Sequence, residues 1–433
     1  MTCPRCGAPA VAGAAFCTHC GAPLSGTAAA QPGSGGGTAV AAAHAPAGPE
    51  RGLHFLALGG LGCLGLLLGF LLLLILLAQA QSFGVFVLSV LLAILPVPIY
   101  AALIVSLDRH VREPLWLLAA AFFWGAVVAS VLAVFFNGIA LGIFNALAGP
   151  NLALPLAASF VAPPVEETAK GLALLLIFLF FRAQLNDVAD GIVLGALVGL
   201  GFAMTENIGY FARAFAQGGL VGAGINFFAR VLFAGFLHPM CTAATGAGLG
   251  LAEETTNPRV RIAAPILGWF AAMFLHFLWN TVAGLLGAAA AASGSGAVLL
   301  VLLPFQTLVL LIPGVVTLLA ITIFAWRRES SVLTTYLKDE VDRGVVLPGE
   351  YALLGDDRGR ARRVWSTLFA HGPAGWYTLR RFYNEEACLA FRKWHTARGE
   401  QLPSYLSARS EDAHRRHIAQ LRTQLQHIGV ATD

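Results

Sequence analysis

Long apolar runs dominate the chain between residues 53 and 326 and constrain its fold more than any other feature. A bilayer core needs about 20 apolar residues for each helix that crosses it. Runs of this kind lie near 53–78, 83–107, 115–147, 155–182, 188–212, 227–251, 262–288 and 296–326. The sequence therefore predicts an all-α polytopic membrane protein with about eight transmembrane helices.

Charged residues are scarce and concentrated at the C-terminal end. Only 12% of the 433 residues are charged and the mean hydropathy is +0.74, whereas soluble domains carry about 25% charged residues. From Arg327 onward lie 17 of the 27 Lys and Arg residues and 13 of the 23 Asp and Glu residues. This pattern predicts a membrane domain over 51–328 and a basic cytoplasmic tail over 329–433. The net charge of +4 favours contact with an anionic membrane surface over nucleic acid.

Four cysteines near the N-terminus have the spacing of a metal site. Cys3 and Cys6 form one Cys-x-x-Cys pair and Cys17 and Cys20 form another, and each pair ends in Cys-Gly. Two such pairs place four thiolates around one tetrahedral zinc ion. We expect a structural zinc ribbon over residues 1–25, followed by a flexible linker of Ala, Gly and Pro over 26–50. Thiolate ligands of this kind indicate a reducing cytoplasm.

The loops between the apolar runs predict the orientation. Arginines cluster in alternate loops, at positions 51, 109, 112, 182, 259, 261, 327 and 328. Positive loops face the cytoplasm, so both termini are expected there, in the plasma membrane of a bacterium. Since the cysteine pairs and a polar linker precede the first apolar run, no signal peptide is expected.

Polar and ionisable side chains interrupt four of the predicted spans. A charged group in hydrocarbon costs roughly 3 to 10 kcal/mol or more. A chain retains such groups when they are paired with each other, hydrated or functional. Span four carries two adjacent carboxylates and an ammonium. The candidate site residues are Glu166, Glu167, Lys170, Glu206, His238, His276 and Asn280, and the same spans also contain Asp190, Asn207 and Arg230. The sequence therefore predicts a functional site inside the membrane.

The depth of these residues is similar. Glu166 and His238 each lie roughly 11 residues from the outer ends of their spans, which is about 16 Å at ~1.5 Å of rise per residue. His276 lies roughly 14 residues from the inner end of its span. Carboxylates can act as a base toward water, and imidazoles can bind a metal or stabilise an oxyanion. This set predicts hydrolysis of a carbonyl substrate, with Glu206, His238 and His276 as possible ligands of a second zinc or other divalent metal.

The motifs resemble those of the PrsW family of intramembrane proteases, which are relatives of the CAAX prenyl endopeptidases and bacteriocin-processing membrane proteins. The resemblance rests on Glu166-Glu167-x-x-Lys170, Phe202-x-x-x-Glu206-Asn207, His238 and His276-x-x-x-Asn280, within roughly residues 85–285. The wider superfamily often has His where this chain has Glu206. The resemblance implies cleavage of membrane-embedded protein substrates, such as anti-sigma factors.

Three readings of the buried polar set remain open. In an intramembrane endopeptidase, Glu166 or Glu167 supplies the base, with Glu167 the freer of the two, and Asn280 donates to the oxyanion or orients a neighbour. Buried Glu, Lys and His also build proton relays in transporters, but no internal repeat pairs the two halves of this chain. A catalytically silent membrane scaffold is the third reading. The expected partners are a membrane-protein substrate and the lipid bilayer, and the sequence makes no prediction about oligomers.

The tail alternates aromatic residues with arginines. Residues 331–343, 385–398 and 410–428 have helical apolar spacing. Trp365 and Trp376 lie among arginines at 362, 363, 380 and 381. This composition fits a small helical domain with a solvated basic face, a surface that docks on lipid headgroups, or, least of all, a surface that stacks on nucleic acid.

Overall fold

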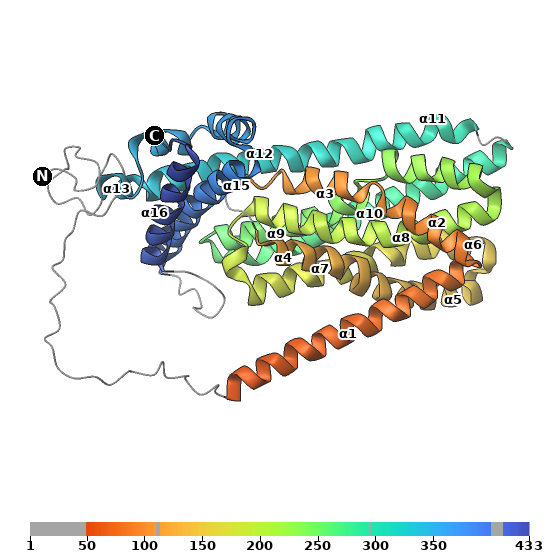
Figure 1. Ribbon diagram of the computed structural model, residues 1–433. Helices are drawn as coiled ribbons and strands as arrows, with labels where there is room; N and C mark the ends of the chain where they lie inside the picture. Colours follow the sequence, from red (N-terminus) through yellow and green to blue (C-terminus); the bar gives the residue numbers. More distant parts are fainter. Residues whose placement is uncertain (1–48, 110–112, 295–296, 400–409, 433) are drawn as a thin grey trace, which may run out of the picture. The chain divides into compact units, whose positions relative to one another are not determined.

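A computed structural model of the protein describes residues 49–109, 113–294, 297–399 and 410–432, and all regular structure in these residues is helical (Figure 1). The four ribbon cysteines Cys3, Cys6, Cys17 and Cys20, and the predicted linker, lie outside the described residues. The chain divides into two compact units. One spans Gly65–Arg327, and the other combines Arg328–Asp433 with the chain up to Leu64.

The first helices of the membrane unit follow the predicted spans closely. The chain enters through α1 (Pro49–Ala80), followed by α2 (Phe83–Ile94) and α3 (Val97–Val105). Then α4 (Leu115–Phe123), the π-helical turn η1 (Trp124–Ala129) and α5 (Ser130–Ala148) run on without a break. Further along, α6 (Pro150–Leu156), the π-helical turn η2 (Ala157–Val161) and α7 (Ala162–Phe180) form a second continuous stretch. The Pro163-Pro164 pair thus stands in the first turn of α7, where proline is tolerated.

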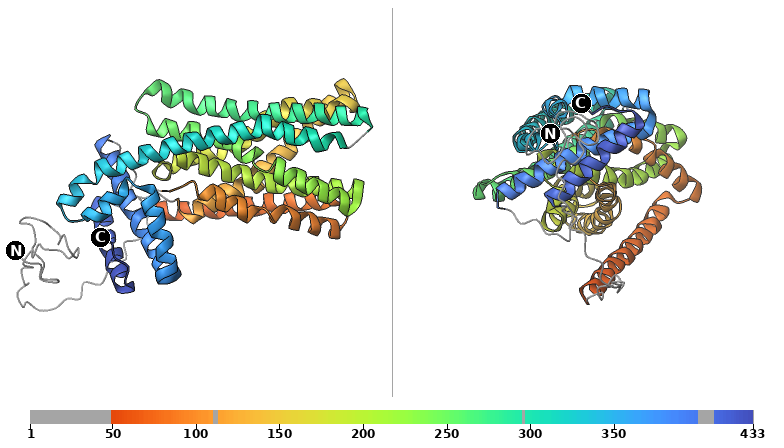
Figure 2. Two further views of the ribbon diagram at one scale, coloured as in Figure 1. Left: turned by 90° about the horizontal axis from the view of Figure 1, so that it is seen from above. Right: turned by 60° about the vertical axis from the view of Figure 1, so that its left-hand side comes forward.

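The second half of the unit contains its longest helices. A short 3₁₀ turn η3 (Arg182–Gln184) leads to α8 (Val188–Phe228), η4 (Ala229–Phe233) and α9 (Leu237–Glu254). Next come α10 (Pro258–Ser293), α11 (Ala297–Gln306), η5 (Thr307–Leu311) and α12 (Ile312–Tyr336). Figures 1 and 2 show α8, α9, α10 and α12 running roughly along one common direction.

Six helical stretches of the described residues are long and apolar enough to cross a membrane, by length and composition. They are Cys63–Ala80, Phe83–Val105, Leu115–Ala148, Val188–Glu254, Pro258–Ser293 and Val301–Tyr336. The stretch Val188–Glu254 has 67 residues and contains two of the predicted spans. The predicted span with three charged residues, in α7, is not among the six. Large apolar side chains such as Leu115 and Phe324 are 83% and 74% exposed, as expected of a surface that faces lipid.

The segment 213–226, predicted to be a loop, is mostly helical. Helix α8 continues through it to Phe228, and the helix breaks at Gly219, whose φ of 59° and ψ of −149° are not helical. The left-handed φ suits glycine, which has no Cβ to clash. The prediction of a loop over 213–226 was therefore wrong, because the helix is interrupted at a single glycine only.

Helix α8 is the buried centre of the unit, with nearly every residue from Val188 to Ala203 inaccessible. It packs against α9 at very short range. A Cβ placed on Gly199 would stand 2.3 Å from the carbonyl oxygen of His238, and one on Gly195 would stand 2.5 Å from that of Thr242. Small residues every four positions allow helix backbones to approach in this way. This contact brings the polar residues of α8 and α9 together.

The second unit is a small helical cluster. It contains α13 (Lys338–Asp342), α14 (Pro348–Leu354), α15 (Asp357–Ala397) and α16 (Glu411–Ile428). Helix α15 is kinked at Gly372, which has a φ of 71°. The predicted helix over 410–428 agrees with α16, whereas 331–343 is divided between the end of α12 and α13. Its core includes the fully inaccessible side chains of Leu333, Leu337, Leu354, Leu379, Phe382, Leu389, Ile418 and Leu425.

Candidate functional site

Four helices bring six of the seven predicted site residues together. Helix α7 supplies Glu166, Glu167 and Lys170, while α8, α9 and α10 supply Glu206, His238 and His276. Glu166, Glu167, Lys170, His238 and His276 are each at most 5% exposed. The i,i+3 and i,i+4 spacing of the α7 residues puts their side chains on one face of the helix.

Glu167 is held by three donors. Lys170 Nζ donates to its Oε1 over 2.8 Å, and His276 Nδ1 lies 2.9 Å from the same oxygen. Thr242 Oγ1 donates to Oε2 over 3.0 Å. These three contacts use most of the acceptor sites of this carboxylate, which indicates that Glu167 is a positioning group. The prediction that Glu167 would be the freer carboxylate is wrong, since its i,i+3 contact with Lys170 is shorter than the 3.5 Å contact of Glu166.

Glu166 keeps one oxygen without a donor. Asn137 Nδ2 of α5 donates to its Oε1 over 3.1 Å. Its Oε2 is buried and has no hydrogen-bond partner. The nearest cationic group is Lys170 Nζ at 3.5 Å, and His276 Nε2 lies 3.9 Å away. Buried polar atoms are nearly always paired, so an unpaired carboxylate oxygen indicates a position for water, a proton or a cation.

The contacts of His276 define the direction of its free nitrogen. Its Nδ1 contacts Glu167 Oε1, which accepts hydrogen bonds only. We assign the Nδ1–H tautomer on this basis, which leaves the lone pair of Nε2 facing Glu166 Oε2 over 3.9 Å. Two acceptors then face each other without a donor between them. Carboxylate–histidine–metal arrangements have this form.

His238 lies in a chain of polar contacts. Lys170 Nζ contacts its Nδ1 at 3.0 Å, and its Nε2 lies 2.9 Å from Glu206 Oε2. Because an ammonium can only donate, Nδ1 accepts and Nε2–H donates to the carboxylate. Glu206 also accepts from Arg230, whose Nε donates to Asn207 Oδ1 over 2.8 Å.

Glu166, His238 and His276 form a possible metal site. One ligand atom from each lies within 4.8 Å of the others, and two histidines with a glutamate are a donor set of catalytic zinc sites. The unpaired Oε2 of Glu166 and the free lone pair of His276 fit such an ion. His238 fits only if Lys170 yields Nδ1. Glu206, which the sequence also predicted as a ligand, is not part of this group because Arg230 and His238 occupy it.

Asn280 forms no hydrogen bond with the other site residues in the described part of the chain. Its Nδ2 donates to the carbonyl of Ala158 in η2 over 2.9 Å. The predicted contact of this amide with His276 is absent from the hydrogen bonds of the described residues. Asn280 instead joins α10 to the helical turn that precedes α7, and so it supports the site from outside.

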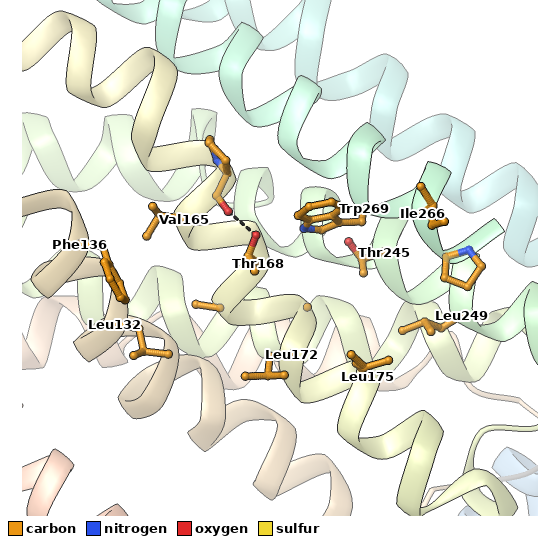
Figure 3. A pocket seen from close by; sticks show the side chains of 14 residues that line it. Leu132, Phe136, Val165, Thr168, Leu172, Leu175, Thr245, Leu249, Ile266 and Trp269 are labelled. Carbon is orange, nitrogen blue, oxygen red and sulfur yellow. Dashed lines mark hydrogen bonds between the residues drawn. The ribbon is translucent and has the colours of Figure 1, made fainter. Parts of the chain in front are cut away.

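Two hollows flank α7. The smaller, of about 260 Å³, is lined by Glu166, Glu206, Asn137 and other residues of α1, α5 and α8. The larger, of about 610 Å³, is apolar and is shown in Figure 3. Its lining residues Val165, Thr168 and Leu172 follow the opposite stripe of α7 from the carboxylates, as the spacing of 100° per residue requires. The smaller cavity is therefore the one that reaches the polar residues.

Comparison with known proteins agrees with this arrangement. Residues 113–312 match the model of the PrsW family, described as intramembrane metalloproteases. This part of the chain, which is somewhat under half of its length, is similar to the PrsW family. Residues 2–24 match a zinc-ribbon domain, as the cysteine spacing predicts. The match runs from the start of α4 to the start of α12 and contains all seven predicted site residues, whereas the expected range was 85–285.

One curated relative is Protease PrsW of Clostridioides difficile (strain 630). It is 36% identical to this chain over 148 residues, which are 33% of this chain and 60% of that protein. The chain thus spans less than two thirds of the length of this relative. No solved structure matches the chain.

The structure adds three residues that sequence reasoning did not assign to this candidate site. Thr242 binds Glu167, Asn137 binds Glu166, and Arg230 binds Glu206. Thr242 and Asn137 are uncharged, so the sequence alone does not distinguish them from other small polar residues in apolar helices. Arg230 is a charged residue within a predicted span, and its cost in hydrocarbon could have identified it as a partner of Glu206.

Proposed function

We propose that this chain is an intramembrane endopeptidase that hydrolyses peptide bonds of membrane-embedded proteins. The observation that carries the proposal is the 3.9 Å approach of Glu166 Oε2 and His276 Nε2, two acceptors without a donor between them. A water molecule there meets a base and an orienting imidazole at once. Similarity to a family described as metalloproteases supports the same reaction.

The roles of the residues follow from their contacts. Glu166 accepts the proton of the attacking water through Oε2, and Asn137 orients this carboxylate through Oε1. Glu167 fixes the ring and tautomer of His276. Lys170 links Glu167 to His238, so one side chain sets the distance between α7 and α9 at the site. These roles stop the polar groups from rotating before a substrate arrives.

A divalent metal ion is the cofactor that the donor set fits. Glu166, His238 and His276 would hold it, with Lys170 yielding Nδ1 of His238, and Oε2 of Glu166 would then be a ligand of the ion rather than the base toward water. An ion at this position would supply Lewis-acid chemistry toward the scissile carbonyl and the attacking water. We further propose that a separate structural zinc ion is held by Cys3, Cys6, Cys17 and Cys20, in keeping with the zinc-ribbon match over residues 2–24.

The proposed topology has about eight transmembrane helices. It counts α7 as a span despite its charges, and it counts Val188–Glu254 as two spans on either side of the break at Gly219. Both termini face the cytoplasm, because arginines occupy alternate loops. The membrane is the plasma membrane of a bacterium. The chain has four parts: ribbon 1–25, linker 26–50, membrane domain 51–328 and tail 329–433.

The substrate class follows from the position of the site. A bond cleaved at Glu166 must reach the interior of the membrane unit, so the substrate is a membrane-embedded protein. An anti-sigma factor with a single transmembrane segment is one such substrate. The small polar cavity between α1, α5 and α8 is the route by which an unwound segment would approach the carboxylate.

The test is cleavage of a single-pass membrane substrate by the purified protein in detergent or nanodiscs. We expect Glu166→Gln and His276→Ala to abolish cleavage and Glu167→Gln to reduce it strongly. Glu253→Gln is the matched control, since this buried carboxylate of α9 pairs with Arg182 outside the site. Cleavage by the Glu166 and His276 variants at the rate of the parent chain would contradict the proposal. If Glu253→Gln also lost cleavage, the loss in the other variants would reflect misfolding rather than a role in the reaction.

A further inference from the structure

The first half of α15 presents aromatic and basic residues on its outer face. Arg358, Arg362, Trp365 and Phe369 are exposed, and the exposed fractions of Trp365 and Phe369 are 56% and 85%. At 100° per residue, spacings of four, seven and eleven positions put all four side chains within about 60° of one another on the helix. They form one continuous stripe, which we call the aromatic–arginine stripe.

The opposite face of the same helix is already used for packing. Arg360 and Thr367 are 7% and 5% exposed, and the Arg360 guanidinium lies 5.1 Å from the ring of Tyr383. Arg363 donates to the carbonyl of Ala431 over 2.6 Å. The first half of α15 therefore buries two polar side chains and exposes two large aromatic ones, whereas an amphipathic helix with its outer face in water shows the opposite pattern.

Nothing in the described residues pairs with the arginines of the stripe. Neither Arg358 nor Arg362 forms a hydrogen bond or ion pair there, whereas Lys393 and Arg415 of the same unit are engaged with Glu340. Two free cations beside two exposed aromatics match the composition of helices that lie in a lipid headgroup layer. Arginine pairs with phosphate, and tryptophan and phenylalanine enter the acyl boundary.

A bilayer is within reach of the stripe. The candidate span Val301–Tyr336 ends twenty residues before α15 begins, and that length of chain cannot extend beyond about 70 Å. The tail also carries the excess positive charge of the chain, with 17 basic and 13 acidic residues from Arg327 onward. Anionic lipids attract basic segments near the membrane, so charge complementarity selects an anionic surface as the occupant.

We propose that the aromatic–arginine stripe docks on an anionic lipid surface, with Arg358 and Arg362 on lipid phosphates and with Trp365 and Phe369 in the interfacial layer. Docking would restrain the C-terminal unit beside the membrane that contains the rest of the chain. This proposal is independent of the proteolytic reaction, since none of the four residues belongs to the candidate site.

The experiment uses the full chain in nanodiscs whose acyl chains carry bromine, a quencher of tryptophan fluorescence at short range. One set is made of phosphatidylcholine and the other contains one third phosphatidylglycerol. The Trp365 contribution is the difference between the parent chain and Trp365→Phe, which cancels the remaining tryptophans. We expect this contribution to be quenched in the anionic nanodiscs, and Arg362→Glu to remove at least about half of the quenching.

Arg416→Glu is the matched control, because Arg416 is an exposed arginine on α16 and the change in net charge is the same. It should leave the quenching unaltered, and circular dichroism should show all variants folded. Absence of quenching in both lipid mixtures would overturn the proposal. Equal quenching in neutral nanodiscs with no effect of Arg362→Glu would overturn the role of lipid charge. A Trp365 signal that is shielded from both the aqueous quencher and bromine would identify a protein as the occupant instead.

Discussion

Replacing Gly199 by alanine tests whether the packing of α8 against α9 sets the geometry of the site. The new Cβ would stand 2.3 Å from the carbonyl oxygen of His238 and 2.7 Å from the nitrogen of Pro239. An ordinary contact between such atoms is about 3.5 Å. The atoms met are backbone atoms, which cannot rotate away, so α9 has to move by about 1 Å at His238.

This displacement acts directly on the polar network. His238 Nδ1 lies 3.0 Å from Lys170 and Nε2 lies 2.9 Å from Glu206, and a shift of about 1 Å takes at least one of these contacts beyond hydrogen-bonding range. Misplacement of this size costs on the order of 100-fold in rate. Overpacking also costs about 1 to 3 kcal/mol of stability. We therefore expect Gly199→Ala to cleave the membrane substrate about 100-fold more slowly and to melt at a lower temperature.

Gly284→Ala provides the control. Gly284 lies on α10, and a Cβ there meets nothing within 4 Å, so the substitution should leave the rate and the melting temperature unchanged or raise the latter slightly. The measurements are initial cleavage rates and thermal unfolding in the same detergent. A Gly199→Ala protein that cleaves at the parent rate would refute the argument, because the helices would then have separated without moving the site.

Three further substitutions test single contacts. Thr242→Val removes the donor to Glu167 Oε2 and should slow cleavage about tenfold without loss of the folded protein, since one hydrogen bond to a charged group contributes about 1.5 to 3 kcal/mol. Arg422→Met removes the cation that pairs with the buried carboxylate of Glu350 and should destabilise the C-terminal unit by about 3 to 5 kcal/mol in thermal or denaturant unfolding. Glu386→Met should stabilise that unit by about 1 to 3 kcal/mol at neutral pH, because both carboxyl oxygens are buried without a hydrogen-bond partner. Burial, and then the charge of Glu350, raise the pKa of Glu386 well above 4.5, so the parent loses stability as the pH rises through that folded-state pKa, and unfolding measured against pH should show a flatter profile for the variant.

The helical membrane fold and the location of the site are predictable from sequence because their causes are local. Apolar runs of sufficient length must form helices in lipid, and charged residues within them are costly enough to stand out. The four-residue repeat of small residues in α8 likewise indicates the close approach that the structure has at Gly195 and Gly199. Hydropathy also predicts most helix ends to within a few residues of their positions in the structure.

The finer roles at the site depend on rotation and distance, which spacing alone does not determine. The i,i+4 relation of Glu166 to Lys170 indicates their pairing, yet the ammonium lies closer to Glu167, which His276 and Thr242 also bind. Asn280 shares a face with His276 in sequence, yet it donates to a backbone carbonyl. The contacts of an uncharged side chain are decided by which helix packs beside it, and only the three-dimensional arrangement supplies that information.

Charge balance argues that Glu166 has a further partner in the functional protein. The ammonium of Lys170 offsets the carboxylate of Glu167, and Arg230 offsets Glu206. With neutral imidazoles at both histidines, one negative charge is left on Glu166, whose Oε2 is buried without a donor. Lys170 lies 3.5 Å from this oxygen but is shared with Glu167, so two buried carboxylates have one ammonium between them. Burying the second charge is costly, and a proton or a further cation on Glu166 would offset it.

Metal content distinguishes these two possibilities. If the donor set holds a divalent ion, the purified chain should contain two metal ions, one in the ribbon and one at the site, and His276→Ala should contain one. Cys3→Ser together with Cys6→Ser should remove the other and leave cleavage unchanged. The parent chain contradicts the metal site if it holds one ion, still cleaves, and keeps that ion in His276→Ala. A proton on Glu166 would then be the compensating charge, and the polar network of α7, α9 and α10 would act on the substrate without a metal.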